Sequence, residues 1–130
     1  MAKILMINPI VREEDNPKHI PYGMALLAAI IDKEGHQVQV YDVNAWRLGD
    51  RELCEVLQAD EWDVIAIGGI TTAYGSIKEI VDFAHTYSPD ALIVVGGGFI
   101  TSMPRDIMKF LAHVDVGVLG EAFETFPEIL

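Results

Sequence analysis

Leu92-Ile93-Val94-Val95-Gly96-Gly97-Gly98 is the stretch that decides the fold. Its unbroken apolar run predicts a buried parallel strand that is covered on both faces. The glycines that follow allow another backbone, or a flat ligand, to approach the carboxyl end of that strand closely. Residues 64–69 and 116–120 have the same form, an apolar run that ends in glycine. Because ligands of open α/β sheets bind outside these carboxyl ends, the sequence predicts a ligand-binding domain of this class.

Strand-like runs alternate with helix-like segments along the whole chain. The runs are residues 4–7, 38–42, 64–67, 92–95 and 114–119. This alternation predicts an α/β fold, a doubly wound five-stranded parallel sheet with helices on both faces. The first, third and fourth runs are continuously apolar, which is typical of central strands, whereas the second and fifth alternate and are predicted at the edges. With right-handed crossovers, these constraints give the flavodoxin-like order 2-1-3-4-5, whose switch point between strands one and three is the expected ligand position.

Local signals predict where several helices begin and end. Gly35 is expected to stop the first helix, and Asp50 to cap the second. Ser76 and Glu79 have the spacing of a capping box, and Pro104 suits the first turn of the next helix.

Composition limits the class of protein and its partners. At 130 residues with 51% apolar content, the chain has the size of one domain with a real core. The 9 basic and 20 acidic residues give a formal charge of -11, which disfavours nucleic acid or an anionic membrane as the main partner. The apolar runs are too short to cross a bilayer, and Asn8-Pro9 ends the first too early for a signal peptide. A cytoplasmic protein is expected.

Two further features bear on organisation. The single cysteine, Cys54, excludes an intrachain disulfide and an all-cysteine metal site, and is expected to be an inert thiol in a helix. Residues 121–130 look like the start of a further helix. We therefore expect residues 1–130 to be one domain of a longer protein.

The loops after the strands argue against three familiar occupants of such a sheet. A phosphate-accepting receiver domain needs acidic residues after strands one and three, where this chain has Asn8-Pro9 and Gly-Gly-Ile-Thr-Thr at 68–72. A flavodoxin-type site needs a hydroxyl-rich loop after strand one, and that loop is missing. A dinucleotide site needs Gly-x-Gly-x-x-Gly at the same turn, and that is missing too. Asp42 alone is then weak support for a ribose-binding acid.

The same loops contain candidate ligand contacts, each with a plainer alternative. The first loop is long, and its shape is restricted by Pro9, Pro17 and Pro21. It places Gly23 at the start of the helix, either so that the backbone can approach a ligand or simply as a turn. Thr71-Thr72 either donates hydroxyl hydrogen bonds into the crevice or caps the next helix.

The glycines at 96–98 are a sharper signal, because they cost chain entropy that a simple turn into a helix does not require. They favour a large planar or nucleotide-like group lying against the strand end. Glu121, after Gly120, either accepts from a ligand amide or hydroxyl or is a first-turn acid favoured by the helix dipole.

Several short segments occur in a recognisable order. They are Pro21-Tyr22-Gly23, Gly35-His36-x-Val38 leading to Asp42, Gly96-Gly97-Gly98-Phe99-Ile100-Thr101-Ser102-Met103-Pro104, and Asp115 with Gly120-Glu121-Ala122-Phe123-Glu124-Thr125. Together they resemble the N-terminal cobalamin-binding domain of radical S-adenosylmethionine enzymes, a family that includes methyltransferases and the anaerobic magnesium-protoporphyrin monomethyl ester cyclase. The resemblance covers essentially the whole chain.

The resemblance implies a corrinoid whose nucleotide tail enters between strands one and three. Its macrocycle would lie over the strand ends and face a downstream radical domain of the same protein. The implied cofactor contacts are Asn8, Pro9, Pro21, Tyr22, Gly23, Gly69, Thr71, Thr72, Gly96, Gly97, Gly98, Phe99, Thr101, Gly120 and Glu121.

No metal ligand is expected in this chain. The cobalt-binding motif Asp-x-His-x-x-Gly has its nearest match at His19, with one residue too many before Gly23 and Pro17 in the place of the aspartate. His19 is therefore read as a solvent-facing loop histidine rather than a cobalt ligand.

The reaction is expected to lie outside the chain. A radical S-adenosylmethionine site needs a Cys-x-x-x-Cys-x-x-Cys array for its iron-sulfur cluster, and only Cys54 is present. The chain is thus interpreted as a cobalamin-holding module for methyl transfer or for oxidative cyclisation of a porphyrin-type substrate, with S-adenosylmethionine bound downstream. The alternative is a non-catalytic flavodoxin-like interaction domain with no corrinoid. A small hydrolase or nucleotide-binding enzyme ranks last, since no nucleophile–base pair is evident.

Overall fold

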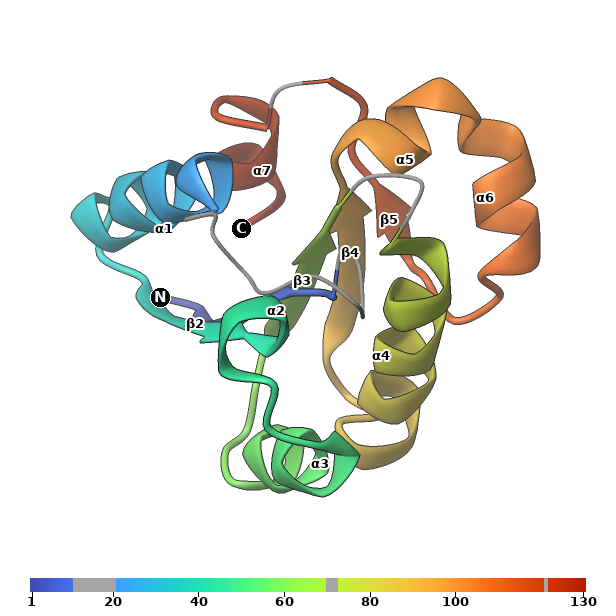
Figure 1. Cartoon of the computed structure of the whole chain (residues 1–130). Helices are drawn as coiled ribbons and strands as arrows, with labels where there is room; N and C mark the ends of the chain where they lie inside the picture. The colour runs from blue at the N-terminus through green and yellow to red at the C-terminus, as the bar shows by residue number, and fades with distance from the viewer. Residues whose placement is uncertain (11–20, 70–72, 121) are drawn as a thin grey trace.

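A computed structural model describes residues 1–10, 21–69, 73–120 and 122–130. Its strands are β1 (Lys3–Asn8), β2 (Gln37–Asp42), β3 (Val64–Gly68), β4 (Leu92–Gly96) and β5 (Val116–Gly117). Its helices are α1 (Tyr22–Lys33), α2 (Val43–Trp46), α3 (Asp50–Gln58), α4 (Tyr74–Tyr87), α5 (Gly98–Ser102), α6 (Pro104–Phe110) and α7 (Thr125–Ile129). Figure 1 shows the sheet in the middle of the molecule, with helices on either side.

The sheet has the order β2-β1-β3-β4-β5, and all neighbouring strands run parallel. This confirms the predicted α/β class and the flavodoxin-like order. The central strands β1, β3 and β4 are buried along most of their length, whereas β2 alternates between exposed and half-buried positions before its buried end. The texture of each run therefore predicted its position in the sheet, because only central strands are covered on both faces.

Each face of the sheet has its own hydrophobic core. One core joins the sheet to α3, α4 and α6 through residues such as Leu57, Ile77 and Ile107. The other joins it to α1 and α7 through Ile31 and Phe126. Figure 1 shows α1 and α7 together on one side and α3, α4 and α6 on the other, which confirms helices on both faces.

Two of the predicted helix starts are wrong. The N-cap of α3 is Gly49, whose backbone N–H donates to Glu52 Oε2 at 3.1 Å, and Asp50 is already in the first turn. Helix α4 begins at Tyr74 without a side-chain cap. The Ser76 hydroxyl instead accepts a hydrogen bond from the Ile10 backbone N–H at 3.1 Å, so a partner distant in sequence takes the predicted capping group. The start of α6 at Pro104 is confirmed.

The fifth strand is shorter than the predicted residues 114–119. A side chain takes over part of the pairing before it, since Asp115 Oδ2 accepts from the Ile93 backbone N–H at 2.8 Å. Beyond the strand, the Val118 N–H still donates to the Val95 carbonyl at 2.8 Å. The edge of the sheet is thus longer than the two residues with regular strand geometry.

Candidate functional site

Strand periodicity brings a row of small and apolar residues to the face of the sheet under α1 and α7. Side chains alternate between the two faces, so Met6, Ala66 and Val94 belong to the core on this face while their neighbours belong to the other. Two residues further along each strand, the same alternation brings Asn8, Gly68 and Gly96 to this face, and the register pairs Gly68 with Gly96. The row at the carboxyl ends therefore has two positions without side chains.

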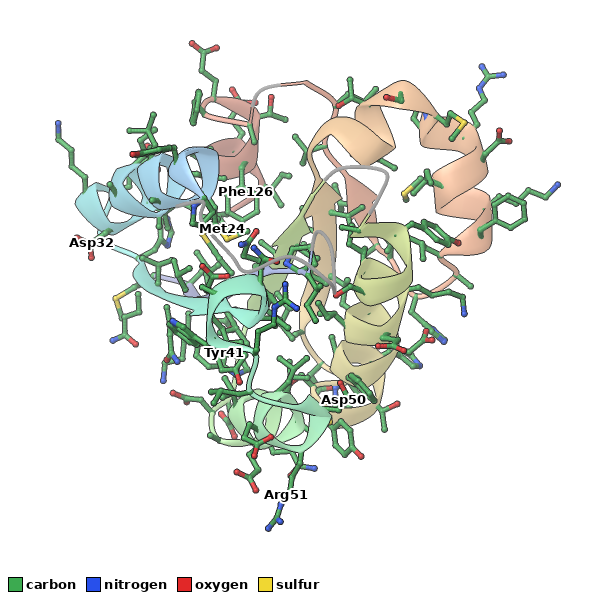
Figure 2. All side chains as sticks on the ribbon, viewed as in Figure 1. Met24, Asp32, Tyr41, Asp50, Arg51 and Phe126 are labelled. Carbon is green, nitrogen blue, oxygen red and sulfur yellow. The ribbon has the colours of Figure 1, made fainter. Side chains whose placement is uncertain are left out.

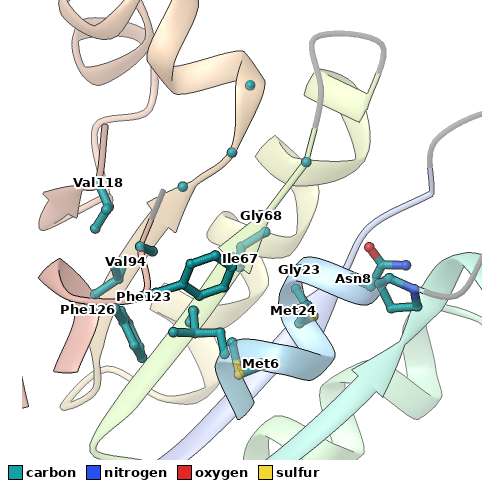
Figure 3. A pocket seen from close by; sticks show the side chains of 18 of the residues that line it. Met6, Asn8, Gly23, Met24, Ile67, Gly68, Val94, Val118, Phe123 and Phe126 are labelled. Atoms are coloured by element: carbon teal, nitrogen blue, oxygen red, sulfur yellow. The ribbon is translucent and has the colours of Figure 1, made fainter. Parts of the chain in front are cut away.

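A pocket of about 540 Å³ opens above this row. Met24 and Leu27 of α1 line one wall, and Phe123 and Phe126, before and within α7, line another. Figures 2 and 3 show Met24 and Phe126 reaching into the space between α1 and α7. The floor includes residues of both β1 and β3, so the pocket lies at the switch point predicted from the strand order.

The glycines around the pocket have two different physical reasons. A Cβ at Gly97 would lie 2.5 Å from the Gly69 carbonyl oxygen and 2.7 Å from its nitrogen, and the φ of Gly97 is +97°. Glycine is required there by the close approach of two backbone loops. A Cβ at Gly68 or Gly96 would meet nothing closer than 3.7 Å or 3.8 Å, which is ordinary contact. Internal packing does not require glycine at these two positions, and they leave open space for a ligand.

The structure brings together most of the residues predicted as ligand contacts. Those that line the pocket are Asn8, Pro21, Gly23, Gly69, Gly96, Gly97, Gly98 and Gly120. Pro9 and Tyr22 do not line it: Pro9 is buried and Tyr22 is 76% exposed. The predictions for Thr71, Thr72, Glu121 and His19 lie outside the described residues, as does the side chain of Phe99.

Thr101 stands beside the pocket and joins two loops. Its hydroxyl donates to the Gly97 carbonyl at 3.1 Å and accepts from the Gly120 backbone N–H at 3.0 Å. Both loops line the pocket, but Thr101 itself does not. In this structure Thr101 therefore acts by holding the two loops together.

Sequence reasoning missed the apolar walls of the pocket. The residues concerned are Met6, Met24, Leu27, Ala66, Ile67, Gly68, Val94, Val118, Ala122, Phe123 and Phe126. Most of them carry the same periodic signal as ordinary core residues. What distinguishes them is the next position along β3 and β4, where a glycine replaces the side chain that would have closed the core.

The polar character of the pocket is concentrated at Asn8. Its Nδ2 donates to Asp42 Oδ1 at 3.0 Å, and the same oxygen accepts from the Ala45 backbone N–H at 2.9 Å at the start of α2. No charged side chain is found among the described residues that line the pocket. The lining is thus suited to an apolar, uncharged group with one polar contact.

Titratable groups with shifted pKa values lie elsewhere in the fold. Burial raises the pKa of the Tyr41 phenol, with smaller contributions from Glu52 and Glu55. Burial also raises the pKa of the half-buried Cys54 thiol, which agrees with the predicted inert cysteine. The hydrogen bond from Lys3 lowers the pKa of the exposed Asp60 carboxyl. None of the four groups Tyr41, Cys54, Lys3 and Asp60 lines the pocket.

Within the described ranges, no cluster of three or more histidine, cysteine or acidic side chains could hold a metal ion. Also within those ranges, no helix is both long and apolar enough to cross a bilayer.

The profile of a family described as B12 binding domain matches residues 9–130. The chain belongs to this family. The pocket fits one end of a B12 cofactor. It is an apolar slot in which two strand ends, at Gly68 and Gly96, carry no side chain, and none of the described residues fills the space that a flat ring would take.

Curated relatives and solved structures are similar to this chain as well. The chain is 27% identical over 137 residues to the anaerobic magnesium-protoporphyrin IX monomethyl ester cyclase of Synechocystis, covering 98% of this B12-binding domain and 27% of the cyclase. The radical S-adenosylmethionine methyltransferase TsrM from Kitasatospora setae superposes with a TM-score of 0.86 at 22% identity, over 99% of this chain and 25% of TsrM.

The cobalamin-dependent S-adenosylmethionine radical enzyme OxsB, with aqua-cobalamin and S-adenosylmethionine bound, superposes with a TM-score of 0.79. Its identity is 16%, over 99% of this chain and 18% of OxsB. These structural likenesses establish the fold. The chain spans about a quarter of the length of the curated relatives that it matches.

Proposed function

We propose that this B12-binding domain holds cobalamin by its nucleotide tail, which enters the pocket between α1 and α7. The observation that carries the proposal is the open row at Gly68 and Gly96, where the sheet lacks side chains on the pocket face. In this arrangement the base of the tail would lie above Ala66 and Val94, between Met24 and Phe126. The corrin ring would remain outside, over the loops that contain Gly98 and Gly120.

Size and polarity support this assignment. A volume of about 540 Å³ is in the range of pockets that hold drug-sized ligands, roughly 300–1,000 Å³, and a benzimidazole nucleotide is a ligand of that kind. The complete corrinoid is much bulkier, so only one end of it can be enclosed. The apolar walls favour an aromatic base through burial of apolar surface. None of the described lining residues carries a negative charge that would repel the phosphodiester linking the base to the ring.

In this proposal the cofactor and the residues of this domain have different roles. When bound, cobalamin supplies the organometallic chemistry of its cobalt centre. The residues of this domain bind and orient the tail, and the loops at Gly98 and Gly120 set the plane on which the ring rests. We propose that the chain is one domain of a longer protein, in which a downstream radical S-adenosylmethionine domain faces this surface and carries out methyl transfer or cyclisation. That extension is supported by the similarity to a radical S-adenosylmethionine methyltransferase (TsrM), to a cobalamin-dependent S-adenosylmethionine radical enzyme (OxsB) and to the cyclase.

Titration of the chain with hydroxocobalamin under anaerobic conditions tests the binding step. We expect near-stoichiometric retention on desalting and an absorption spectrum of cobalamin with its base detached from cobalt, because the pocket and the metal compete for the same base. Release of all cobalamin on desalting, by this chain and by a longer form, would contradict the proposal. So would retention with the base still attached to cobalt.

The substitution Gly68→Leu tests the pocket itself. Its Cβ has only ordinary contacts, with the Gly96 carbonyl at 3.7 Å and the Met24 Cε at 3.9 Å, so the longer side chain occupies the slot rather than striking backbone. A clash of 1–3 kcal/mol with the base corresponds to a loss of affinity of roughly 5- to 150-fold. The matched control is Gly75→Ala on α4, where a Cβ meets nothing within 4 Å. Equal cobalamin affinity in the folded Gly68→Leu variant and in the control would exclude this pocket.

A further inference from the structure

Asn8 is the one residue with an amide, hydroxyl or charged side chain among the described residues that line the pocket. It is the last residue of β1, and the register sets it beside Asp42, the last residue of β2. Strand alternation brings both side chains to the pocket face of the sheet. On the other side of Asn8 lies Gly68, which has no side chain, so the amide forms the polar edge of the open row (Figure 3).

Asp42 determines which way the Asn8 amide is turned. An ionised carboxylate has only acceptors, so the group that approaches Asp42 Oδ1 at 3.0 Å must be the Asn8 NH₂. Asp42 is itself held in place, because it is 8% exposed and its Oδ1 also accepts from the Ala45 backbone N–H. The alternative amide orientation would bring the Asn8 oxygen against the carboxylate, oxygen to oxygen, and is therefore disfavoured.

The fixed orientation leaves a defined chemical group for a ligand. The Asn8 Oδ1 accepts no hydrogen bond from any residue of the described ranges. We infer that Asn8 Oδ1 accepts a hydrogen bond from the bound corrinoid. Asp42 acts as a positioning residue, because it binds the Asn8 NH₂ and so keeps this oxygen available to the ligand. The inference rests on the proposed function, and it adds the atom of Asn8 that makes the contact and the polarity of that contact.

The ligand must then present a hydrogen-bond donor at the wall formed by β1. A corrinoid has two kinds of donor near its tail: the hydroxyl groups of the ribose and the amide groups at the edge of the corrin ring. Both have the same chemistry towards Asn8 Oδ1. They are distinguished by cobinamide, which retains the ring amides and lacks the nucleotide tail.

The decisive variant is Asn8→Leu, which keeps the approximate shape of the side chain and removes the acceptor. Its matched control is Gln39→Leu, which removes an exposed amide from the neighbouring strand β2, away from the pocket. Asp42→Asn tests the positioning role, since asparagine still caps α2 but no longer obliges the Asn8 amide to present its NH₂. Cobalamin and cobinamide affinities are measured for each variant, together with the midpoint of thermal unfolding.

We expect Asn8→Leu to weaken cobalamin binding about tenfold, equivalent to ~1.4 kcal/mol. Asp42→Asn should weaken it less, and Gln39→Leu should leave it unchanged. If the donor is a ribose hydroxyl, cobinamide affinity is unaffected by Asn8→Leu. If the donor is a ring amide, cobinamide affinity falls by a similar factor.

Wild-type cobalamin affinity in a folded Asn8→Leu variant would overturn the inference and leave the proposed function standing. Failure of the unsubstituted chain to bind cobalamin would instead overturn the proposed function. Should Asn8→Leu not fold, Asn8→Ala replaces it, because alanine removes the amide oxygen, offers no other side-chain acceptor and adds no bulk. Unchanged affinity in Asn8→Ala would have the same meaning.

Discussion

The substitution Gly97→Ala isolates the glycine that the fold itself requires. Gly97 has φ +97° and ψ −177°, a backbone conformation that is essentially restricted to glycine and costs other residues about 1–3 kcal/mol. The added Cβ would also lie 2.5 Å from the Gly69 carbonyl oxygen. The three atoms nearest to this Cβ all belong to the Gly69 backbone, so no flexible side chain can move aside to relieve the contact.

The cost of the backbone conformation and the cost of the steric contact are expected to add, because the first arises from φ and ψ of residue 97 and the second from the distance between its Cβ and the Gly69 backbone. Overpacking of this kind typically costs about 1–3 kcal/mol, so the sum with the conformational cost is about 4 kcal/mol. Whole domains are stable by only about 5–15 kcal/mol, which makes the expected loss a large part of the total. The loops at Gly69 and Gly97 would separate, and the mouth of the pocket would widen.

Urea unfolding of the cofactor-free chain, followed by far-ultraviolet circular dichroism, measures this loss. We expect the midpoint for Gly97→Ala to fall strongly while the slope stays constant. The control Gly75→Ala, in α4 and clear of other atoms, should raise the free energy of unfolding by about 0.5 kcal/mol. A loss below about 1 kcal/mol for Gly97→Ala would contradict both the left-handed conformation of Gly97 and the close loop contact, since the conformational cost alone is about 1–3 kcal/mol.

Two further predictions concern the opposite face of the sheet. Tyr41 is 4% exposed, and its hydroxyl has no hydrogen-bond partner among the described residues. Tyr41→Phe should therefore leave the free energy of unfolding unchanged or raise it by about 1 kcal/mol, as measured by thermal or urea unfolding. A clear decrease would indicate a partner for the hydroxyl. Because burial raises the pKa of Cys54, the folded state favours the neutral thiol, and the stability that this contributes is lost as pH rises through the alkaline range. Iodoacetamide at pH 8 should then alkylate Cys54 more slowly in the folded chain than in urea, and equal rates would show a freely ionising thiol.

The strand order could be predicted because burial leaves a direct mark on sequence. Val64 to Ile67 is covered on both faces and reads as a continuous apolar run, while β2 faces solvent on alternate residues and reads Gln-Val-Gln-Val. The starts of helices were harder to predict from sequence, since a side chain that could cap a helix can instead form a hydrogen bond with a distant part of the chain. Ser76 looks like a cap in sequence, yet its hydroxyl binds the backbone of Ile10. Local spacing contains no information on that contact.

For the site, the sequence indicated the edge of the sheet at which the pocket lies but not the role of each glycine. Gly96 and Gly97 are adjacent and identical in sequence, but one leaves space over the pocket and the other accommodates the Gly69 backbone. Only the crossing of two loops in space separates these roles. The contribution of Phe126 was also missed, because its apolar signal is that of any core residue and its position over the sheet depends on how α7 folds back beside α1.

The most direct test of the central claim is a crystal structure of the chain with cobalamin bound. The account predicts that the base of the nucleotide tail lies between α1 and α7, in contact with the backbone at Gly68 and Gly96, and that a ligand donor reaches the oxygen of Asn8. The opposite result would be a cobalamin seated elsewhere, with side chains of α1 and α7 closed over the row of glycines.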